Sequence, residues 1–283
     1  MSLLSGASSQ LGRTYSRVEA GLTKPYLYVP PRKLSTTLRF LDPSDSPDLL
    51  DYRKIARLFE TSWKHQHKQL PRIKKIFAVS LPDHLNKSYD EYKGFLEARW
   101  NGVNEQLMFH GTTRGCSLGE EEQDITLCEE MTCSLCCILR TSFLVSMAGS
   151  ARRGCNRFGS GIYTSSASST ADHYAIAPWL SDDKAIIVAK VALGKSSIHY
   201  RASENLTAPP WGYDSVIGKV GIDLNDDDQV VYRNEAIRPA YIVIYERPNS
   251  PSVTTVPRPA PKATRSNMTT KTKSSTSSRC TIM

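Results

Sequence analysis

The stretch FGSGIYTSSASSTADHY, residues 158–174, decides the fold of this chain. Its first half contains GIYTS, which is predicted to form a strand because β-branched and aromatic residues follow the glycine. The segment SSTADHYA (168–175) is predicted to form a short helix. Tyr163 and Tyr174 are therefore expected eleven residues apart, the first on the strand and the second on the helix.

Two other segments belong with this stretch. MFHGTT (108–113) precedes it, at the end of the apolar run QLMFHG, which suits a strand that leads into a functional loop. DDQVVYRNEAIRPAYIVIYE (227–246) follows it and begins with DQVVYR, a predicted strand, as is YIVIYER near its end. None of the three segments identifies a function by itself.

In this order and at these spacings, the three segments resemble the catalytic domain of the poly(ADP-ribose) polymerase superfamily, the diphtheria-toxin-like ADP-ribosyltransferases, in its fungal stand-alone type. Members of this family cleave NAD between nicotinamide and ribose and transfer ADP-ribose to an acceptor. The resemblance covers about residues 50 to 247, roughly the length of one larger domain. It implies an α+β fold, the ADP-ribosyltransferase fold, with a mixed, mostly antiparallel split β-sheet and flanking helices.

The resemblance also assigns NAD-binding roles to particular residues. His110 is similar to the histidine whose ring nitrogen donates to the adenosine ribose, Gly111 to the residue whose backbone pairs with the nicotinamide carboxamide, and Thr112 stands beside them. Tyr163 and Tyr174 match the two tyrosines that sandwich the nicotinamide ring, where each contact is worth roughly 0.5–2 kcal/mol. The alternative is that both tyrosines are ordinary half-buried residues.

Two positions depart from the family pattern. The resemblance implies a catalytic triad of His110, Tyr163 and Asp228, but the transferase form prefers Glu at the third position. Asp keeps the charge and is one methylene shorter, and a misplacement of ~1 Å can cost on the order of 10²-fold in rate. Ala171 stands where the family usually has a Ser that binds the nicotinamide amide. Alternatively, residues 226–228 form a solvated turn that enters a strand.

Cysteines are concentrated between the first two segments. The pattern Cys116-x11-Cys128-x4-Cys133-x2-Cys136 supplies four thiolates, enough for a tetrahedral structural zinc ion that would hold the long insertion in place. Without an export signal, reduced thiols or metal ligands are more typical than disulfides. The alternative is that Cys136 and its neighbour Cys137 pack on a buried helix face as small hydrophobic residues. A helix is expected from about Cys133 to Met147.

Further elements are predicted from periodicity and from runs of apolar residues. Ser46 is expected to be the N-cap of a helix with Pro47 at its first position. Apolar residues at helical spacing predict the buried faces of two helices, and β-rich runs predict strands at 72–81 and 184–194. The helical residues are Ile55, Leu58, Phe59 and Trp63 in the first helix and Tyr89, Tyr92, Phe95, Leu96 and Trp100 in the second.

The chain of 283 residues is predicted to consist of three parts. Residues 1–44 form a disordered arm, residues 45–247 the catalytic domain with a Cys-rich insertion at 113–157, and residues 248–283 a disordered Ser/Thr/Pro-rich tail. The tail has six Lys and Arg and no acid, so of the formal charge of +8 the rest carries 8 − 6 = +2. A nearly neutral body argues against nucleic acid as a partner.

The ends of the sequence suggest an intracellular location. Residues 1–35 lack the apolar core of a secretory signal, and no 18-residue apolar run is present. The sequence CTIM (280–283) fits a farnesylation signal on Cys280, and the basic tail supplies a second membrane signal. Peripheral membrane association through a prenylated Cys280 is therefore expected, against an unmodified tail.

The leading functional hypothesis is the transfer of single ADP-ribose units from NAD to an unknown protein acceptor. Single units are favoured over polymer because the carboxylate that would also activate an acceptor hydroxyl, Asp228, is shortened. The alternative is a catalytically weak or inactive NAD- or ADP-ribose-binding module that acts as a membrane-tethered scaffold. Asp228 and Ala171 support this alternative.

Overall fold

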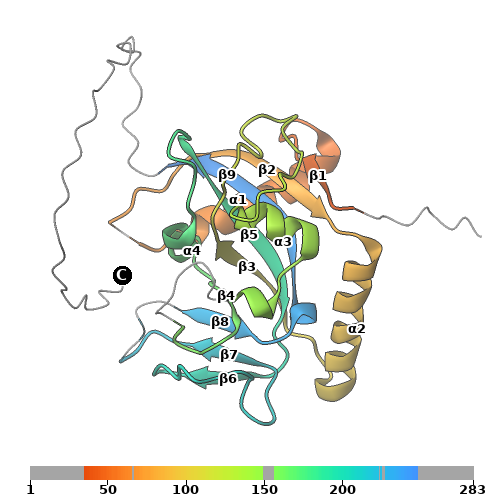
Figure 1. Cartoon of the computed structure of the whole chain (residues 1–283), viewed down its shortest axis with the longest axis vertical. Helices are drawn as coiled ribbons and strands as arrows, with labels where there is room; N and C mark the ends of the chain where they lie inside the picture. Colours follow the sequence, from red (N-terminus) through yellow and green to blue (C-terminus); the bar gives the residue numbers. More distant parts are fainter. Residues whose placement is uncertain (1–34, 66, 149–155, 223, 225–226, 248–283) are drawn as a thin grey trace, which may run out of the picture. The chain divides into compact units, whose positions relative to one another are not determined.

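In the computed structural model of the chain, residues 35–65, 67–148, 156–222, 224 and 227–247 are described, and their strands form two sheets (Figure 1). The larger sheet has the strand order β1-β2-β9-β5-β3, and every neighbouring pair is antiparallel. Its strands are β1 (Thr37–Phe40), β2 (Ile73–Ser80), β9 (Ile237–Glu246), β5 (Asp183–Ala192) and β3 (Glu105–Gly111).

The smaller sheet has the order β4-β8-β7-β6, in which only the pair β6 and β7 is parallel. Its strands are β4 (Ile162–Thr164), β8 (Asp228–Val231), β7 (Ser215–Gly218) and β6 (Ser196–His199). The two sheets meet where Phe109 at the end of β3 and Ser165 after β4 exchange backbone hydrogen bonds of 2.9 Å. The predicted α+β fold with a mostly antiparallel split sheet is confirmed.

Helices cover both faces of the larger sheet. The helices are α1 (Ser46–Thr61), α2 (Asp83–Trp100), α3 (Ser134–Thr141) and α4 (Ser168–Tyr174), with 3-10 turns η1 (Val145–Met147) and η2 (Asn234–Ala236). Ile187 of β5 belongs to a core cluster with side chains of α2 and α3, whereas its neighbour Ile186 packs with side chains of α1 and α4. The apolar run at residues 185–189 of β5 follows from this position, because a strand buried on both faces needs no polar alternation.

The buried face of α1 is the predicted one, but its start is not. Ile55 and Phe59 are fully buried, as the helical period required. The N-cap, however, is Asp45, and Ser46 is already the first helical residue. Ser46 was expected as the N-cap because a proline follows it, but the helix starts one residue earlier, so that Pro47 still lies within its first turn.

Two further element boundaries differ from the predicted ones: the start of the ordered domain and the end of α3. Residues 37–40 were assigned to a disordered arm, but they form β1, which pairs with β2 from Thr37 opposite Ser80 to Phe40 opposite Phe77. The ordered domain therefore begins before residue 45. The helix expected from Cys133 to Met147 ends at Thr141, because Ser142 has φ of 61°, a left-handed conformation in which an α-helix cannot continue.

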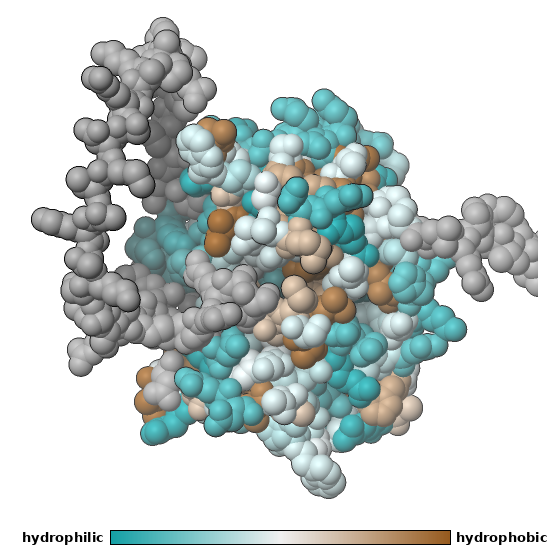
Figure 2. All heavy atoms as spheres, in the orientation of Figure 1, coloured by the Kyte–Doolittle hydropathy of each residue, from teal (hydrophilic) through white to brown (hydrophobic). Residues whose placement is uncertain are grey.

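The polarity of the surface and the termini bear on the predicted membrane association. Figure 2 shows hydrophilic side chains over much of one face, with smaller hydrophobic areas between them. Among the described residues, no helix is long and apolar enough to cross a membrane. Cys280, the basic tail and most of the predicted N-terminal arm lie outside the described residues, so prenylation and membrane association stay predictions.

Candidate active site

The junction of the two sheets brings His110 and Tyr163 together. His110 precedes the last residue of β3, and Tyr163 is the middle residue of β4. The exchange of hydrogen bonds between Phe109 and Ser165 aligns these strand ends, and Nδ1 of His110 lies 2.8 Å from the Tyr163 carbonyl oxygen. A carbonyl only accepts, so Nδ1 carries the proton of a neutral ring and Nε2 is left as an acceptor.

Desolvation of the partly buried His110 ring determines whether the ring is protonated. Desolvation lowers the pKa of His110 below its ordinary value of 6.5, and the hydrogen bond to Tyr163 opposes this only in part. The ring is therefore neutral at pH 7. The sequence analysis expected this histidine to donate to a ribose hydroxyl, but with the proton on Nδ1 the free nitrogen accepts.

This lowered pKa predicts how stability depends on pH. Below pH 6.5 the unfolded chain takes up a proton at His110 before the folded chain does, so the free energy of unfolding falls as the pH drops below 6.5. Replacing His110 by Gln is expected to make this fall shallower between pH 7 and pH 5. Urea denaturation of both proteins over this range measures the difference. Parallel pH profiles would contradict a neutral, desolvated His110.

Tyr163 is fixed by its hydroxyl. The hydroxyl donates to the Gly159 carbonyl at 2.9 Å and accepts from the Phe158 amide at 2.8 Å. Burial raises the pKa of Tyr163 well above its ordinary value, and the charges of Asp228 and Tyr174 add to the increase. Tyr163 therefore stays neutral and offers its ring. In the smaller sheet Tyr163 pairs with Val230, two residues after Asp228.

Gly111 is required by close packing within the protein itself. A Cβ atom on this residue would lie 1.8 Å from the carbonyl oxygen of Ala171 in α4, far inside van der Waals contact. The end of β3 therefore approaches the backbone of α4 directly, which joins two of the predicted NAD-binding segments. Thr112 continues this contact, because its carbonyl accepts from the amide of Ile176 at 3.1 Å.

We expect Gly111→Ala to destabilise the fold strongly. Relieving the clash with Ala171 must shift β3 or α4, and overpacking of this kind costs about 1–3 kcal/mol or more. The matched control is Gly94→Ala in α2, where a Cβ would meet nothing within 4 Å and where alanine is the better helix former. Thermal denaturation compares the two; equal melting temperatures would contradict the close approach at Gly111.

Helix α4 carries the other predicted NAD-binding positions. Tyr174 is its last residue and is 43% exposed, whereas Ala171 is buried in the core cluster that contains Phe59 and Phe109. Ser169 lies two residues before Ala171, and its hydroxyl accepts from the Lys64 amide at 3.0 Å, in the loop after α1.

The two described residues of the acidic triplet are structured. Asp228 is the first residue of β8, half-buried and opposite Gly218 of β7. Asp227 accepts hydrogen bonds from Ser165 and Ser166, which follow β4. Asp228 thus enters a strand, as the alternative of a turn before a strand also requires, while two serine hydroxyls hold Asp227. Asp226 lies outside the described residues.

A cavity of about 610 Å³ opens beside Asp227. This volume lies in the usual range for a ligand-binding pocket. The predicted NAD residues do not appear among its described lining residues, and two lysines face it. It is lined by Lys64, His65, Ala167, Tyr200, Lys219, Val220 and Asp227. This set could not be found from sequence motifs, because its residues come from four separate loops.

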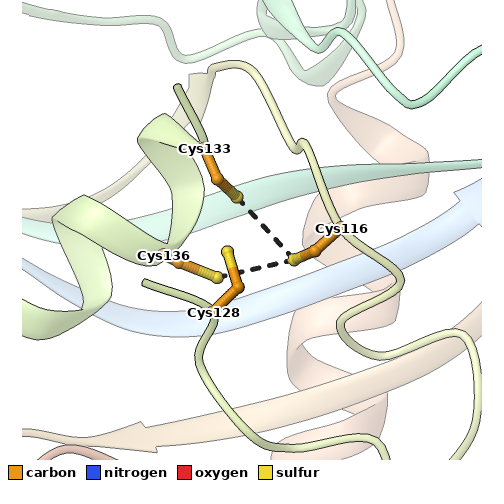
Figure 3. Close-up of side chains that lie close together, drawn as sticks. All are labelled: Cys116, Cys128, Cys133 and Cys136. Carbon is orange, nitrogen blue, oxygen red and sulfur yellow. Dashed lines mark hydrogen bonds between the residues drawn. The ribbon is translucent and has the colours of Figure 1, made fainter. Parts of the chain in front are cut away.

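The predicted metal ligands form a compact cluster (Figure 3). The sulfur atoms of Cys116, Cys128, Cys133 and Cys136 all lie within 4.8 Å of one another. Cys116 Sγ is 3.7 Å from Cys133 Sγ and 3.6 Å from Cys136 Sγ. Four sulfurs around a tetrahedral zinc ion, each about 2.3 Å from it, stand about 3.8 Å apart. The cluster can therefore hold a metal ion.

The surroundings of the sulfurs favour a thiolate at Cys133 alone. Cys133 and Cys136 are fully buried, and the Gly115 amide donates to Cys133 Sγ at 3.2 Å. The hydrogen bond with Cys136 lowers the pKa of Cys133 to about 4, and the same hydrogen bond raises the pKa of Cys136. Burial raises the pKa of Cys116 to about 11. Cys137 lies apart from the cluster, with its sulfur 3.8 Å from the carbonyls of Glu130 and Met131. Only Cys136 of this adjacent pair therefore faces the other thiols.

A buried arginine fastens the start of the insertion. Arg114 is 1% exposed, and its guanidinium donates to the Leu118 carbonyl at 3.1 Å and to the Asp183 carbonyl at 2.7 Å. It also forms an ion pair of 2.9 Å with Glu120. Sequence reasoning missed this residue, because an arginine in a polar loop gives no sign of burial.

Comparison with known proteins agrees with this arrangement. Residues 132–236 match the model of the poly(ADP-ribose) polymerase catalytic domain. The chain is 28% identical over 214 residues to protein mono-ADP-ribosyltransferase PARP4 of Homo sapiens. This alignment covers 74% of the chain and 12% of that protein. It is 37% identical over 105 residues to the Mus musculus protein of the same name, covering 35% of the chain and 5% of that protein.

The chain thus spans only a small part of these relatives, 12% and 5% of their length. The matched region includes Tyr163, Tyr174 and Asp228, and the split sheet joins them to His110. Residues 132–236 are therefore similar to the catalytic domain of the poly(ADP-ribose) polymerase superfamily.

Proposed function

We propose that this protein transfers single ADP-ribose units from NAD to a protein acceptor and releases nicotinamide. One observation carries the proposal: the Nδ1 of His110 bonds the backbone of Tyr163 at the junction of the sheets, and Asp228 enters β8 close to the same tyrosine. The relatives named as mono-ADP-ribosyltransferases support the single-unit reaction, as does the short side chain of Asp228.

In the proposed reaction the chain's residues hold NAD from several sides. Nε2 of His110 accepts a hydrogen bond from a ribose hydroxyl, and the backbone of Gly111 pairs with the carboxamide. The rings of Tyr163 and Tyr174 contact the cationic nicotinamide, whose positive charge is attracted to an aromatic face. Fixing NAD in one pose supplies a large part of the catalysis, since a well-oriented reactant has lost its entropy before the reaction.

Bond cleavage then depends on charge stabilisation by Asp228. The electron pair of the ribose–nicotinamide bond goes to the ring nitrogen, so nicotinamide leaves neutral and positive charge grows on the ribose. The Asp228 carboxylate holds a ribose hydroxyl and stabilises that charge. The acceptor's nucleophile forms the new bond to the ribose carbon and loses its proton to solvent or to a base.

The cavity beside Asp227 is the proposed entrance for the acceptor. It lies next to Asp228 in the chain, and its described lining lacks the residues assigned to NAD. Among the described lining residues, Lys64 and Lys219 face one carboxylate, Asp227, which already accepts from Ser165 and Ser166. The local charge favours an acceptor segment that carries negative charge.

A second candidate function is NAD or ADP-ribose binding without transfer. Two observations favour it: Asp228 is shorter than the glutamate of the transferase form, and Ala171 is buried with no hydroxyl to offer the nicotinamide. The absent hydrogen bond costs roughly 1 kcal/mol of binding. In this case the domain would recognise the nucleotide and present it, or itself, to a partner.

Labelled NAD separates the two candidates. Purified full-length chain is incubated with NAD labelled in its adenylate half, while calorimetry measures NAD binding on the same sample. Label on protein together with released nicotinamide supports the transferase. Saturable binding without label supports the binding module. A chain that neither binds NAD nor transfers label would overturn both.

For the cysteine cluster the proposal is a structural zinc ion. The four thiolates of Cys116, Cys128, Cys133 and Cys136 fill a tetrahedral coordination sphere, which is the pattern of structural and not catalytic zinc sites. When bound, zinc supplies a cross-link between the loop after β3 and the start of α3. It would add to the core contacts of Leu118 and Cys133 in a part of the insertion that has no helix or strand between Gly111 and Ser134.

A further inference from the structure

The ring of His110 has a second neighbour, which comes from the insertion. Phe143 contacts it edge to face, with ring centroids 5.0 Å apart and an interplanar angle of 87°. Phe143 is 3% exposed, so its own position is fixed by packing. The hydrogen bond to the Tyr163 carbonyl sets which nitrogen carries the proton, and the Phe143 contact limits rotation of the imidazole. Together the two contacts determine where Nε2 points.

Phe143 is connected to the cysteine cluster by one short helix. Cys133 immediately precedes α3, Cys136 lies within it, and Phe143 follows its end by two residues. The helix buries Leu135 and Leu139 in the main core cluster, which also contains Phe143. A shift at the cysteine end is therefore carried to Phe143, because eight helical residues move as one unit.

The same helix also touches the strand end that carries His110. The Leu135 amide donates to the Thr113 carbonyl at 2.9 Å, and the Gly115 amide donates to Cys133 Sγ at 3.2 Å. Thr113 is three residues beyond His110. Two routes thus lead from the sulfurs to the histidine, one through Thr113 and one through Phe143.

The cluster is the part of the insertion that needs a cross-link. A helix of eight residues is too short to be stable without tertiary contacts, and four thiols brought within 4.8 Å gain little from one another. The Arg114 contacts hold residues 114–120, which include Cys116, without help from the sulfurs. Loss of the metal is therefore expected to loosen α3 and Phe143 while residues 114–120 stay attached to β5.

We infer that metal binding at the four cysteines and NAD binding at His110 strengthen each other, with Phe143 as the positioning residue between them. This coupling rests on the proposed role of His110 in holding NAD. By thermodynamic linkage, the factor by which zinc raises the affinity for NAD equals the factor by which NAD raises the affinity for zinc. An edge-to-face pair predicts a factor of about three to ten for the contribution of Phe143.

The test compares NAD affinity in zinc-loaded protein, chelator-treated protein and two variants. Phe143→Ala removes the ring, and Phe143→Leu keeps a large apolar side chain without an aromatic edge, so it preserves folding if the alanine variant does not fold. Both are expected to bind NAD about three- to tenfold more weakly at unchanged zinc content. Phe95→Ala, on the exposed face of α2, is the matched control and should bind NAD as the wild type does.

Either of two results from the affinity measurements would overturn the inference: wild-type NAD affinity in Phe143→Leu, or NAD affinity that is unchanged when zinc is removed. Imidazole nitrogen signals of His110, measured by NMR without NAD, give an independent readout. They should shift in Phe143→Leu and in zinc-free protein, and constant signals would also overturn the inference. If the zinc-loaded wild type does not bind NAD, the proposed function is wrong. The imidazole signals, measured without NAD, still show whether the cysteine cluster and Phe143 position His110.

Discussion

Asp228→Ala is expected to lower the rate of ADP-ribose transfer by about 10²–10³-fold, the usual effect of removing one preorganised group that stabilises transition-state charge. NAD affinity should change by about fivefold or less, because the carboxylate makes at most one hydrogen bond to the bound nucleotide. The effect falls on the chemical step, since positive charge on the ribose develops only as nicotinamide leaves. Initial rates of nicotinamide release, with calorimetry of NAD binding, separate these two quantities.

Asp228→Glu gives the opposite expectation. The longer side chain restores the reach of the transferase form, so the rate should rise, by as much as about 10²-fold if the carboxylate is now misplaced by ~1 Å. Glu235→Ala is the control: this carboxylate is 45% exposed, pairs only loosely with Arg233 at 3.9 Å, and lies beyond β8. A transfer rate that survives in Asp228→Ala would show that another group carries the chemistry.

Most of the sheet was predictable, because its central strands leave a strong pattern. The apolar run of β5 and the strand that ends at His110 were both assigned before their pairing was known, and they lie side by side with His110 opposite Ile187. Short edge elements were not predictable. β1 has four residues, too few to show a period, and its place in the sheet comes from pairing with β2.

The site was predictable only where motif residues carry it. His110 and Tyr163 stand in recognisable segments, and the structure brings them together. Phe143 and Arg114 had no such signal, because an aromatic residue after a helix and an arginine in a loop are common anywhere. Their roles follow from contacts with residues far along the chain, as in the Arg114 bond to Asp183. The left-handed Ser142, which ends α3 and precedes Phe143, was equally hidden.

The cysteine cluster makes the second large prediction. Purified protein should contain about one equivalent of zinc, and Cys133→Ser should lose it, together with about 4 kcal/mol or more of unfolding free energy, because metal loss is among the strongly destabilising changes. Cys133 is the best residue to replace, because it is fully buried, contacts Cys116 and accepts a hydrogen bond from the Gly115 amide. Metal analysis and urea denaturation with and without chelator measure both effects.

Cys137→Ser is the matched control, because it exchanges the same atom four residues further along. Its sulfur faces backbone carbonyls outside the cluster, so zinc content and stability should stay close to wild type. A chelator should lower the stability of the wild type and of Cys137→Ser but leave Cys133→Ser unchanged, because that variant has no metal to lose. Zinc below about a tenth of an equivalent in the wild type would remove the metal site. The four sulfurs would then be a buried thiol cluster, and the insertion would depend on the contacts of Arg114 and on the packing of α3.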